Sequence, residues 1–582
     1  MKTLKPVRIV QFKNKPGAPL ENAARMINII DKARKDGVGL VVFPDKAIQG
    51  IYSGFNVFNS AFVEDCGEAA KQVIAASGGI SILFGAMICD KEGVPYDRIV
   101  FAEDGHEVAS EDFDDPTELV STYSGKFSFV SPYMVKCEAD NPTSKPDTKF
   151  FVVCDHLSYE RLDLDETHGG LSDMAFAANR PVFYSNPVGI QDADKLVHIY
   201  RGDSAVFDAR GRRVALATPF EECALTLSPA DCGGKCSMRE IPIVDEGIGE
   251  VVEALRYGLR EMMAQTGVRR VVIGVSGGID SAVSTALYGS ILKPEDMLLV
   301  SMPGPFTSAT TRGLAHQLAK NVGARFAEIP IGESVELTKR QFAELVTDGP
   351  NGAMAGAWSL SSSAVENVQA RDRGSRILAA AAAAFGGVVS CNANKDECTV
   401  GYGTMYGDIT GWLCCLGDLW KQDVYDVGRY LNDKVYRREV IPKGIFTVKP
   451  SAELSEKQAV EKGLGDPLVY PYHDALFRVW VEGSMAPVDI LKWYLDGELE
   501  ENLELDGIDV DKLFPTPADF IADLERWWNL YCGLSVAKRL QAPPTLVVSH
   551  CPFGTITSSQ SGPYYGSRYR ELKEKALTSR SE

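Results

Sequence analysis

The chain has 582 residues, 45% of them hydrophobic and 24% charged, and no apolar run reaches the about 18 residues that a membrane span needs. It carries 79 acidic and 60 basic residues, and this net charge of −19 argues against a general nucleic-acid surface. A chain of this length exceeds one hydrophobic core, so we expect at least two domains.

The compartment is predicted from the cysteines and from the first residues. The 13 cysteines are scattered along the chain, which indicates reduced thiols and no disulfide framework. The first residues, MKTLKPVRIVQFKN, lack the apolar region of a signal peptide. We therefore expect a cytoplasmic protein that binds neither membrane nor nucleic acid.

Residues 1–240 are predicted to form the first domain. Residues 21–37 have a helical pattern that Gly37 ends. Short apolar runs typical of strands predict an α/β layered domain and lie at residues 7–12, 39–45, 80–89, 98–102, 150–155 and 181–189. The segment 228–246 is rich in Pro, Gly and Cys and has little periodicity, so we interpret it as the linker.

Residues 245–582 are predicted to form the second domain, which starts with a helix and then alternates strands and helices. The strands are expected at 269–275, 297–303 and 324–331, with a helix at 308–323. This βαβαβ order predicts a doubly wound parallel sheet. The alanine run at 379–384 is interpreted as a tightly packed helix.

The stretch IGVSGGIDSA (273–282) joins the first of these strands to a helix through Gly277 and Gly278. Glycines at such a turn let the backbone approach a ligand, and the helix N-terminus then favours an anion. A bare phosphate would be repelled by Asp280, so a divalent cation is expected between them. The spacing is not that of a Walker loop, because no lysine is present. A glycine-rich turn without a ligand is the alternative.

The segment SGGIDS resembles the pyrophosphatase-type loop of amidotransferases that adenylate their substrates with ATP. Five further segments follow in the order of the NAD synthetase family. They are ENVQARDR (366–373), NKDE with TVGYGTMYGD (394–397, 399–408), GDLWKQDVY (417–425), PSAEL (450–454) and KRLQAPP (538–544).

This resemblance implies an ATP-dependent amidation of deamido-NAD to NAD that releases AMP and pyrophosphate. ATP is then the co-substrate, with Mg²⁺ held by Asp280 and Glu397. The ATP-binding residues would be Gly274, Val275, Ser276, Gly277, Gly278, Ile279, Asp280, Ser281 and Asn392, the last standing where the family usually has threonine. The residues that bind deamido-NAD would be Asn367, Glu397, Lys421 and Lys538.

The first half resembles the nitrilase-like glutaminase that precedes the synthetase in long family members. The segments VVFPDKAIQGIYSGF (41–55), PVFYSNPVGIQD (181–192) and RGDSAVFDARGRRVA (201–215) carry this resemblance. It implies a nitrilase-like αββα sandwich, followed by a domain that resembles the adenine nucleotide alpha-hydrolases with an ATP pyrophosphatase loop.

Such a glutaminase uses a Glu base, a Lys and a Cys nucleophile. Asp45 stands at the Glu position, and the loop 106–125, where the lysine should lie, contains none. Cys137 best fits the nucleophile by its distance to later segments, with Cys154 as the second candidate. We therefore expect an impaired glutaminase and a synthetase that uses ammonia.

Three alternatives remain open. The first is a fully glutamine-dependent synthetase with an active N-terminal glutaminase. The second is a non-catalytic scaffold that binds adenine nucleotides. The third is a related adenylating amidotransferase with another carboxylate substrate, because MPGPFTSATT (302–311) matches the family weakly. The resemblance also implies a homo-oligomer whose partners are deamido-NAD, ATP and ammonia or glutamine.

Overall fold

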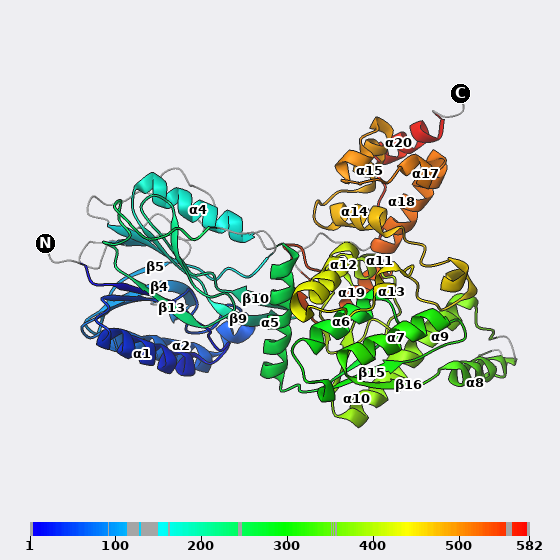
Figure 1. Ribbon diagram of the computed structural model, residues 1–582, viewed down its shortest axis with the longest axis horizontal. Coiled ribbons are helices and arrows are strands. Elements are labelled where there is room, and N and C mark those ends of the chain that lie inside the picture. The colour runs from blue at the N-terminus through cyan, green and yellow to red at the C-terminus, as the bar shows by residue number, and fades with distance from the viewer. Residues whose placement is uncertain are drawn as a thin grey trace. The chain divides into compact units, whose positions relative to one another are not determined.

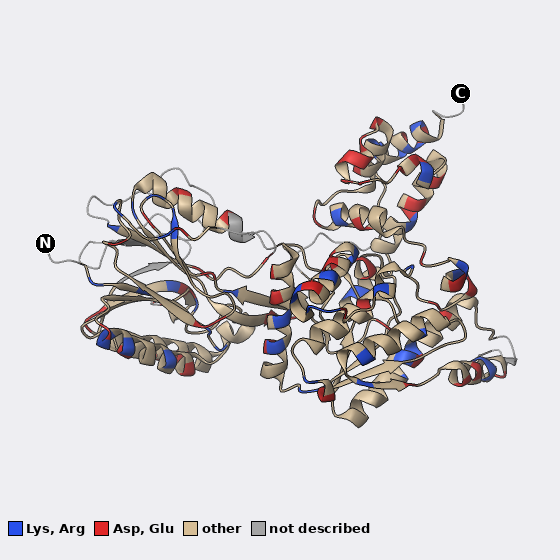
Figure 2. Cartoon of the chain, viewed as in Figure 1, with Lys and Arg blue, Asp and Glu red and all other residues tan. Residues whose placement is uncertain are grey.

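Figure 1 shows the computed structural model of the chain, which forms two compact units, Met1–Gly247 and Ile248–Glu582. The structure describes residues 4–90, 92–112, 127–129, 149–160, 163–242, 247–350, 352, 354–355, 358–554 and 562–578. Within these residues, no helix is long and apolar enough to cross a membrane. Acidic and basic side chains are mixed along outer helices such as α1 and α8 (Figure 2), as on solvated faces.

The first unit contains two sheets and a hairpin. The order of the first sheet is β13-β1-β2-β3-β4-β5, with strands Cys223–Leu227, Val7–Gln11, Leu40–Val42, Ser81–Cys89, Pro95–Glu103 and His106–Asp112. The order of the second is β12-β11-β8-β7-β6, with strands Arg213–Leu216, Ala205–Phe207, Val182–Ser185, Phe150–Cys154 and Phe127–Phe129. The hairpin pairs β9 (Val188–Ala193) with β10 (Leu196–Arg201).

Alternating side chains organise this unit into four layers. Ile9 and Val42 from the first sheet share one core with Val152 from the second sheet. Their neighbours in sequence point to the opposite faces, where they pack under α1 (Pro19–Lys35), α2 (Ser60–Ala75) and α4 (Asp163–Ala178). Helices α1 and α2 lie side by side on one sheet, and α4 covers the other (Figure 1). This arrangement confirms the predicted nitrilase-like αββα sandwich.

Two expectations for the first unit need correction. Much of segment 228–246 is packed structure and not a free linker, because Cys232 and Cys236 are buried in the core between the sheets. The expected strand 181–189 is two strands, since β8 ends at Ser185 and β9 begins at Val188. Apolar content alone does not reveal such a break.

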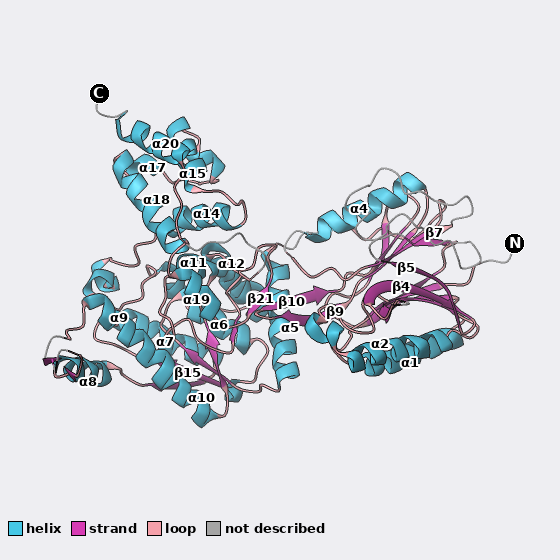
Figure 3. Cartoon of the chain, turned by 180° about the vertical axis from the view of Figure 1, so that it is seen from behind, coloured by secondary structure: helices cyan, strands magenta, loops and turns pink. Residues whose placement is uncertain are grey.

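The second unit contains a parallel sheet with the order β16-β15-β14-β19-β20-β21. These strands are Arg325–Glu328, Met297–Ser301, Val271–Gly274, Val388–Cys391, Leu413–Cys414 and Thr545–Val547. Numbered along the chain, this is the doubly wound order 3-2-1-4-5-6. The helices around it are α5 (Ile248–Thr266), α6 (Ile279–Gly289), α7 (Ala309–Val322), α8 (Gly332–Ala343), α9 (Ser362–Arg371), α10 (Ala379–Phe385), α11 (Lys395–Val400), α12 (Lys421–Tyr430), α13 (Lys443–Thr447) and α19 (Ser535–Gln541). Helices α7 and α10 lie on opposite sides of β15 (Figures 1 and 3).

The alanine run is helical as predicted, within α10, but it is not tightly packed. Only Ala382 of this helix is fully buried; Ala381 and Phe385 are partly buried against the same apolar cluster, and the rest of the run is exposed.

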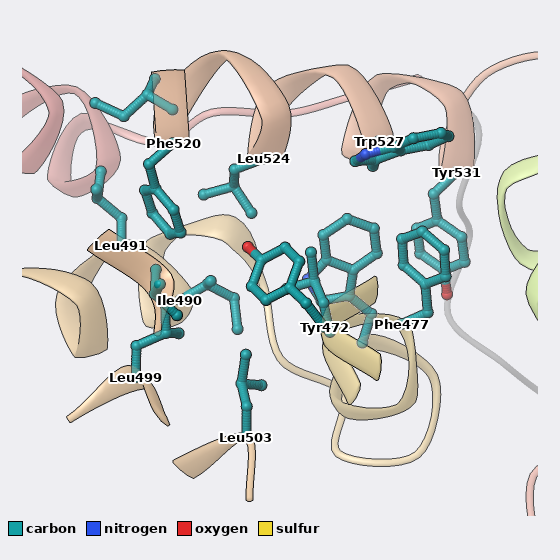
Figure 4. Close-up of a cluster of buried hydrophobic side chains, with 14 of the residues drawn as sticks. Tyr472, Phe477, Ile490, Leu491, Leu499, Leu503, Phe520, Leu524, Trp527 and Tyr531 are labelled. Atoms are coloured by element: carbon teal, nitrogen blue, oxygen red, sulfur yellow. The ribbon is translucent and has the colours of Figure 1, made fainter. Parts of the chain in front are cut away.

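Beyond the sheet, a helical bundle completes the unit. It comprises α14 (Tyr470–Val481), α15 (Pro487–Asp496), α16 (Leu499–Asn502), α17 (Val510–Leu513), α18 (Pro517–Tyr531) and α20 (Ser567–Thr578). Its core is rich in aromatic side chains, and Tyr472, Phe477 and Trp527 lie together within it (Figure 4).

Candidate active site

The glycine loop lies between the end of β14 and the start of α6, where the strand order reverses. β14 pairs with β15 on one side and with β19 on the other, and ligands bind doubly wound sheets at such a crevice. Gly277 has a φ of +85°, and an added Cβ would lie 2.1 Å from the Thr311 carbonyl oxygen, so only glycine fits. Gly278 caps α6 without a side-chain bond, which leaves N–H groups of the first turn for an anion.

The polar side chains of the loop fix its shape. The Ser276 N–H donates to the Ser281 Oγ at 3.3 Å, and the two hydroxyl oxygens lie 3.2 Å apart. The Gly278 N–H donates to the Ser276 Oγ at 3.2 Å. Asn392, which follows β19, donates its amide N–H to the Gly274 carbonyl at 3.0 Å. The ends of β14 and β19 are thereby held together at the crevice.

A charged cluster from three separate segments stands beside the loop. The Lys421 Nζ lies 2.5 Å from the Asp280 Oδ2, and the Asn394 amide donates to the other Asp280 oxygen at 2.9 Å. Asn394 also caps α11 through a capping box with Glu397. The loop aspartate is therefore bonded to the residues that begin α11 and α12.

Burial controls the protonation of this cluster. Burial raises the pKa of Glu397 well above its ordinary value, and the negative charge of Asp280 raises it further. Burial alone would lower the pKa of Lys421, but the charges of Asp280 and Glu397 outweigh it and raise the pKa, so the ammonium stays charged. The site thus holds one fixed cation in contact with the Asp280 carboxylate and under the electrostatic influence of Glu397.

The cluster and the loop line one cavity of about 280 Å³. Ten of the predicted site residues line it: Gly274, Val275, Ser276, Gly278, Ile279, Asp280, Ser281, Asn392, Glu397 and Lys421. The cavity therefore combines hydroxyl and backbone donors with a lysine and two carboxyl groups. Such a set can bind phosphates and a hard cation.

Three predicted residues of this unit lie outside the cavity lining. Gly277 packs against α7. The Asn367 amide donates to the Ser363 carbonyl at 2.8 Å and accepts from the Thr404 hydroxyl at 2.9 Å. The Lys538 ammonium donates to the Gly401 carbonyl at 2.6 Å, and burial lowers its pKa. The roles assigned to Asn367 and Lys538 by resemblance stay predictions.

The cavity also contains charged residues that sequence reasoning did not assign. Arg373, Asp408, Glu453 and Asp466 line it. The first three lie in the segments ENVQARDR, TVGYGTMYGD and PSAEL, which carry the family resemblance, but the sequence analysis assigned these three residues no role. Asp466 belongs to no motif, and its place follows only from the fold.

The two carboxyl groups suit a magnesium ion. Asp280 and Glu397 offer hard oxygen donors; burial and then the charge of Asp280 raise the pKa of Glu397, and a cation bound here would favour its ionised form. Mg²⁺ is commonly held by one or two carboxylates together with substrate phosphates. In the described parts of the chain, no group of three or more His, Cys, Asp or Glu side chains is arranged to hold a metal. The pair could therefore hold Mg²⁺ only together with a ligand.

The first unit brings a carboxylate and a thiol together. Asp45 is 1% exposed; its Oδ1 accepts the Lys46 N–H at 2.7 Å, and its Oδ2 lies 3.0 Å from the His156 Nδ1. Cys154 ends β7 and is fully buried, and the Asp45 N–H donates to the carbonyl of the next residue, Asp155, at 3.2 Å. Burial raises the pKa of this thiol well above its ordinary value, and the charges of Asp45 and Asp155 add to the effect. His156 was not predicted, although it stands two positions after Cys154.

The other cysteine candidate, Cys137, lies outside the described residues. The expected lysine loop, 106–125, is described only as far as Asp112, where it forms strand β5. Within the described residues, the structure therefore places Cys154 beside Asp45 and leaves the choice between the two cysteines a prediction.

Comparison with known proteins gives a consistent result over nearly the whole chain. Residues 251–504 match the model of the NAD synthase family. The glutamine-dependent NAD(+) synthetase of Xanthomonas campestris pv. campestris (strain 8004) is 28% identical over 593 residues, which cover 96% of this chain and 98% of that protein. That of Synechocystis sp. (strain ATCC 27184 / PCC 6803 / Kazusa) is 31% identical over 324 residues, 55% of this chain and 54% of that protein.

Two solved structures share the fold along the chain. The glutamine-dependent NAD+ synthetase of Acinetobacter baumannii, in complex with ADP, has a TM-score of 0.66 at 22% identity and covers 96% of this chain and 99% of its own. That of Cytophaga hutchinsonii has a TM-score of 0.73 at 13% identity and covers 99% and 100%. With the glycine loop and its charged cluster in one cavity, residues 251–504 thus match the NAD synthase family, and the chain is similar to glutamine-dependent NAD synthetases along nearly its whole length.

Proposed function

We propose that the chain catalyses the ATP-dependent amidation of deamido-NAD to NAD. ATP adenylates the pyridine carboxylate and pyrophosphate leaves; ammonia then attacks the acyl adenylate and AMP is released. The observation that carries this proposal is the contact of Asp280 with Lys421, near Glu397, where the glycine loop passes into α6. A carboxylate is a poor acyl donor, so the site must stabilise the charge on the leaving pyrophosphate.

The residues divide this task by their chemistry. The N–H groups at the start of α6 and the hydroxyls of Ser276 and Ser281 bind phosphate oxygens. The Lys421 ammonium stays charged and lies against the developing negative charge. Asp280 and Glu397 would hold Mg²⁺, which screens the charge of the phosphates when it is bound.

For the nitrogen source, we propose glutamine. The X. campestris relative, which matches along 96% of this chain including the first unit, is named as glutamine-dependent. Cys154 beside Asp45 supplies a thiol and a carboxylate where a glutaminase needs its nucleophile and base. This reading replaces the ammonia-dependent one as the leading proposal.

Ammonia alone is the second candidate, and the chemistry of the first unit favours it. Asp45 is one methylene shorter than glutamate, and misplacement by about 1 Å can cost about 10²-fold in rate. Its carboxylate accepts the Lys46 backbone N–H and lies 3.0 Å from the His156 Nδ1, and burial raises the pKa of the Cys154 thiol. Residues 106–125 contain no lysine.

One assay separates these proposals. The purified chain is given ATP, Mg²⁺ and deamido-NAD with either ammonium or glutamine, and AMP and NAD are quantified. NAD formation with both donors supports the glutamine-dependent enzyme, and formation with ammonium alone supports the second candidate. AMP formation that does not depend on deamido-NAD would contradict the synthetase proposal.

A further inference from the structure

A buried ion pair lies behind the charged cluster. Lys395 and Asp418 have side chains that are 0% and 1% exposed, and their Nζ and Oδ1 atoms lie 2.9 Å apart. The same Nζ donates to the Ser549 Oγ at 2.9 Å. It also lies 3.4 Å from the Glu482 Oε1 and 5.0 Å from the centre of the Trp420 ring. The lysine charge is thus enclosed by two carboxylates, a hydroxyl and an aromatic face.

Both carboxylate oxygens of Asp418 also accept hydrogen bonds. Its Oδ2 accepts the N–H groups of Val548 and Ser549 at 2.8 and 2.7 Å, and its Oδ1 accepts the Ser549 hydroxyl at 2.7 Å. These bonds fix the segment that follows β21. The pair therefore connects the start of α11, the turn before α12 and the end of the last strand of the sheet.

The pair is joined to the reactive cluster through the backbone. The Lys395 N–H donates to the Leu419 carbonyl at 2.9 Å. In return, the Lys421 N–H donates to the Asp396 Oδ2 at 2.7 Å. Glu397 stands two residues after Lys395, and Lys421 stands three residues after Asp418. These two backbone N–H groups therefore tie the segment that carries Glu397 to the segment that carries Lys421.

Stability alone does not account for this pair. Burying two charges costs free energy that their attraction seldom exceeds, and apolar replacements of both are often neutral or stabilising. Neither Lys395 nor Asp418 is among the described residues that line the cavity, so neither can touch a ligand there.

We propose that the Lys395–Asp418 ion pair is a positioning device for the adenylation site, which sets the distance between the Glu397 carboxylate and the Lys421 ammonium. The inference rests on the proposed function, since it concerns the same chemical step. Lys395 acts through the backbone of α11 and Asp418 through the turn before α12. The pair affects the transition state, in which both groups must face the phosphates, more than the binding of ATP.

The test is a double-mutant cycle on purified full-length chain. Lys395→Met removes the charge at similar length, and Glu397→Asp shortens the carboxylate. We measure kcat and KM for ATP in AMP formation dependent on deamido-NAD, corrected for the folded fraction by circular dichroism. Lys395→Met should lower kcat at least tenfold and change KM for ATP less than threefold. In the Glu397→Asp background it should cost less than twofold, because the carboxylate is already misplaced.

Leu524→Ala is the matched control, since Leu524 is fully buried in the helical bundle and belongs to the apolar cluster of Figure 4. It should lower the melting temperature and leave kcat within twofold. A Lys395→Met kcat within twofold of wild type, or effects that multiply in the cycle, would overturn the inference. If Lys395→Met does not fold, Lys395→Met/Asp418→Asn takes its place, and failure of both to fold would show a folding role instead. Wild type without deamido-NAD-dependent AMP formation would overturn the proposed function itself.

Discussion

The Asp280 Oδ2 lies 2.5 Å from the Lys421 Nζ, although 141 positions separate the two residues in the chain. The contact joins the glycine loop to the start of α12, and it keeps the ammonium charged inside a buried site. We therefore expect Lys421→Met to lower kcat for AMP formation by about 10²-fold or more, since one fixed charge is lost from the leaving group.

Lys434→Met is the matched control for this change, because Lys434 is an exposed lysine of the same unit. It should leave kcat within twofold. Wild-type turnover by Lys421→Met would show that the ammonium does not face the leaving group.

Asp280→Asn keeps the size of the side chain and removes its charge. Because Lys421 would lose its nearest anion and the metal site one of its two carboxylates, AMP and pyrophosphate release should fall by about 10²-fold or more. The measurement is pyrophosphate release with ATP and deamido-NAD over a range of Mg²⁺ concentrations. A fall of less than tenfold in pyrophosphate release, with an unchanged dependence on Mg²⁺ concentration, would exclude Asp280 as a metal ligand.

Gly277→Ala should disrupt the loop through a backbone clash. The new Cβ would lie 2.1 Å from the Thr311 carbonyl oxygen, so the loop or α7 must shift. We expect kcat/KM for ATP to fall at least tenfold. Gly267→Ala separates the clash from backbone strain, because Gly267 has a φ of +71° with nothing within 4 Å of an added Cβ. Equal losses in the two variants would mean that strain alone explains the effect.

Cys154→Ala tests the first unit. If this thiol attacks glutamine, the variant should lose glutamine-supported NAD formation by about 10³-fold or more and keep ammonium-supported formation within twofold. Cys232→Ala is the control, as another fully buried cysteine of the same unit. A loss of glutamine use in Cys137→Ala with no loss in Cys154→Ala would assign the nucleophile to Cys137.

His168 makes the stability of the first unit depend on pH. Burial and the neighbouring Arg213 lower its pKa from 6.5 to about 3, while its Nε2 bonds to the Asp203 carbonyl at 3.0 Å. Between about pH 3 and pH 6.5, the His168 imidazole is protonated in the unfolded chain but neutral in the folded chain. The stabilisation is thus complete above pH 6.5 and falls as the pH drops toward 3, by about 1.4 kcal/mol per pH unit.

His168→Gln should flatten this dependence, because glutamine can donate to the Asp203 carbonyl and accept from Arg213 without titrating. Urea unfolding between pH 7 and pH 4.5, followed by circular dichroism, provides the measurement. An unchanged pH slope in the variant would show that other groups cause the acid sensitivity.

The nitrogen source shows where reasoning from motifs reaches its limit. Asp45 and the lysine-free loop 106–125 favoured ammonia, whereas the X. campestris relative that matches 96% of the chain is named as glutamine-dependent. The role of a motif residue depends on its distance in space to other residues, which the spacing along the sequence does not give. Neither the Asp45–His156 contact nor the position of Cys154 near Asp45 could be predicted from that spacing.

By itself, the sequence determined the two α/β halves, the strand–loop–helix at 269–289 and the resemblance to a family, because these depend on local patterns and on short motifs in order. The tertiary structure alone decided the strand order that places β19 beside β14, the break between β8 and β9, and the aromatic bundle beyond residue 470. It also decided that Lys395 and Asp418 form a buried pair behind the site. Contacts between residues far apart in the chain depend on packing and burial, which no local pattern encodes.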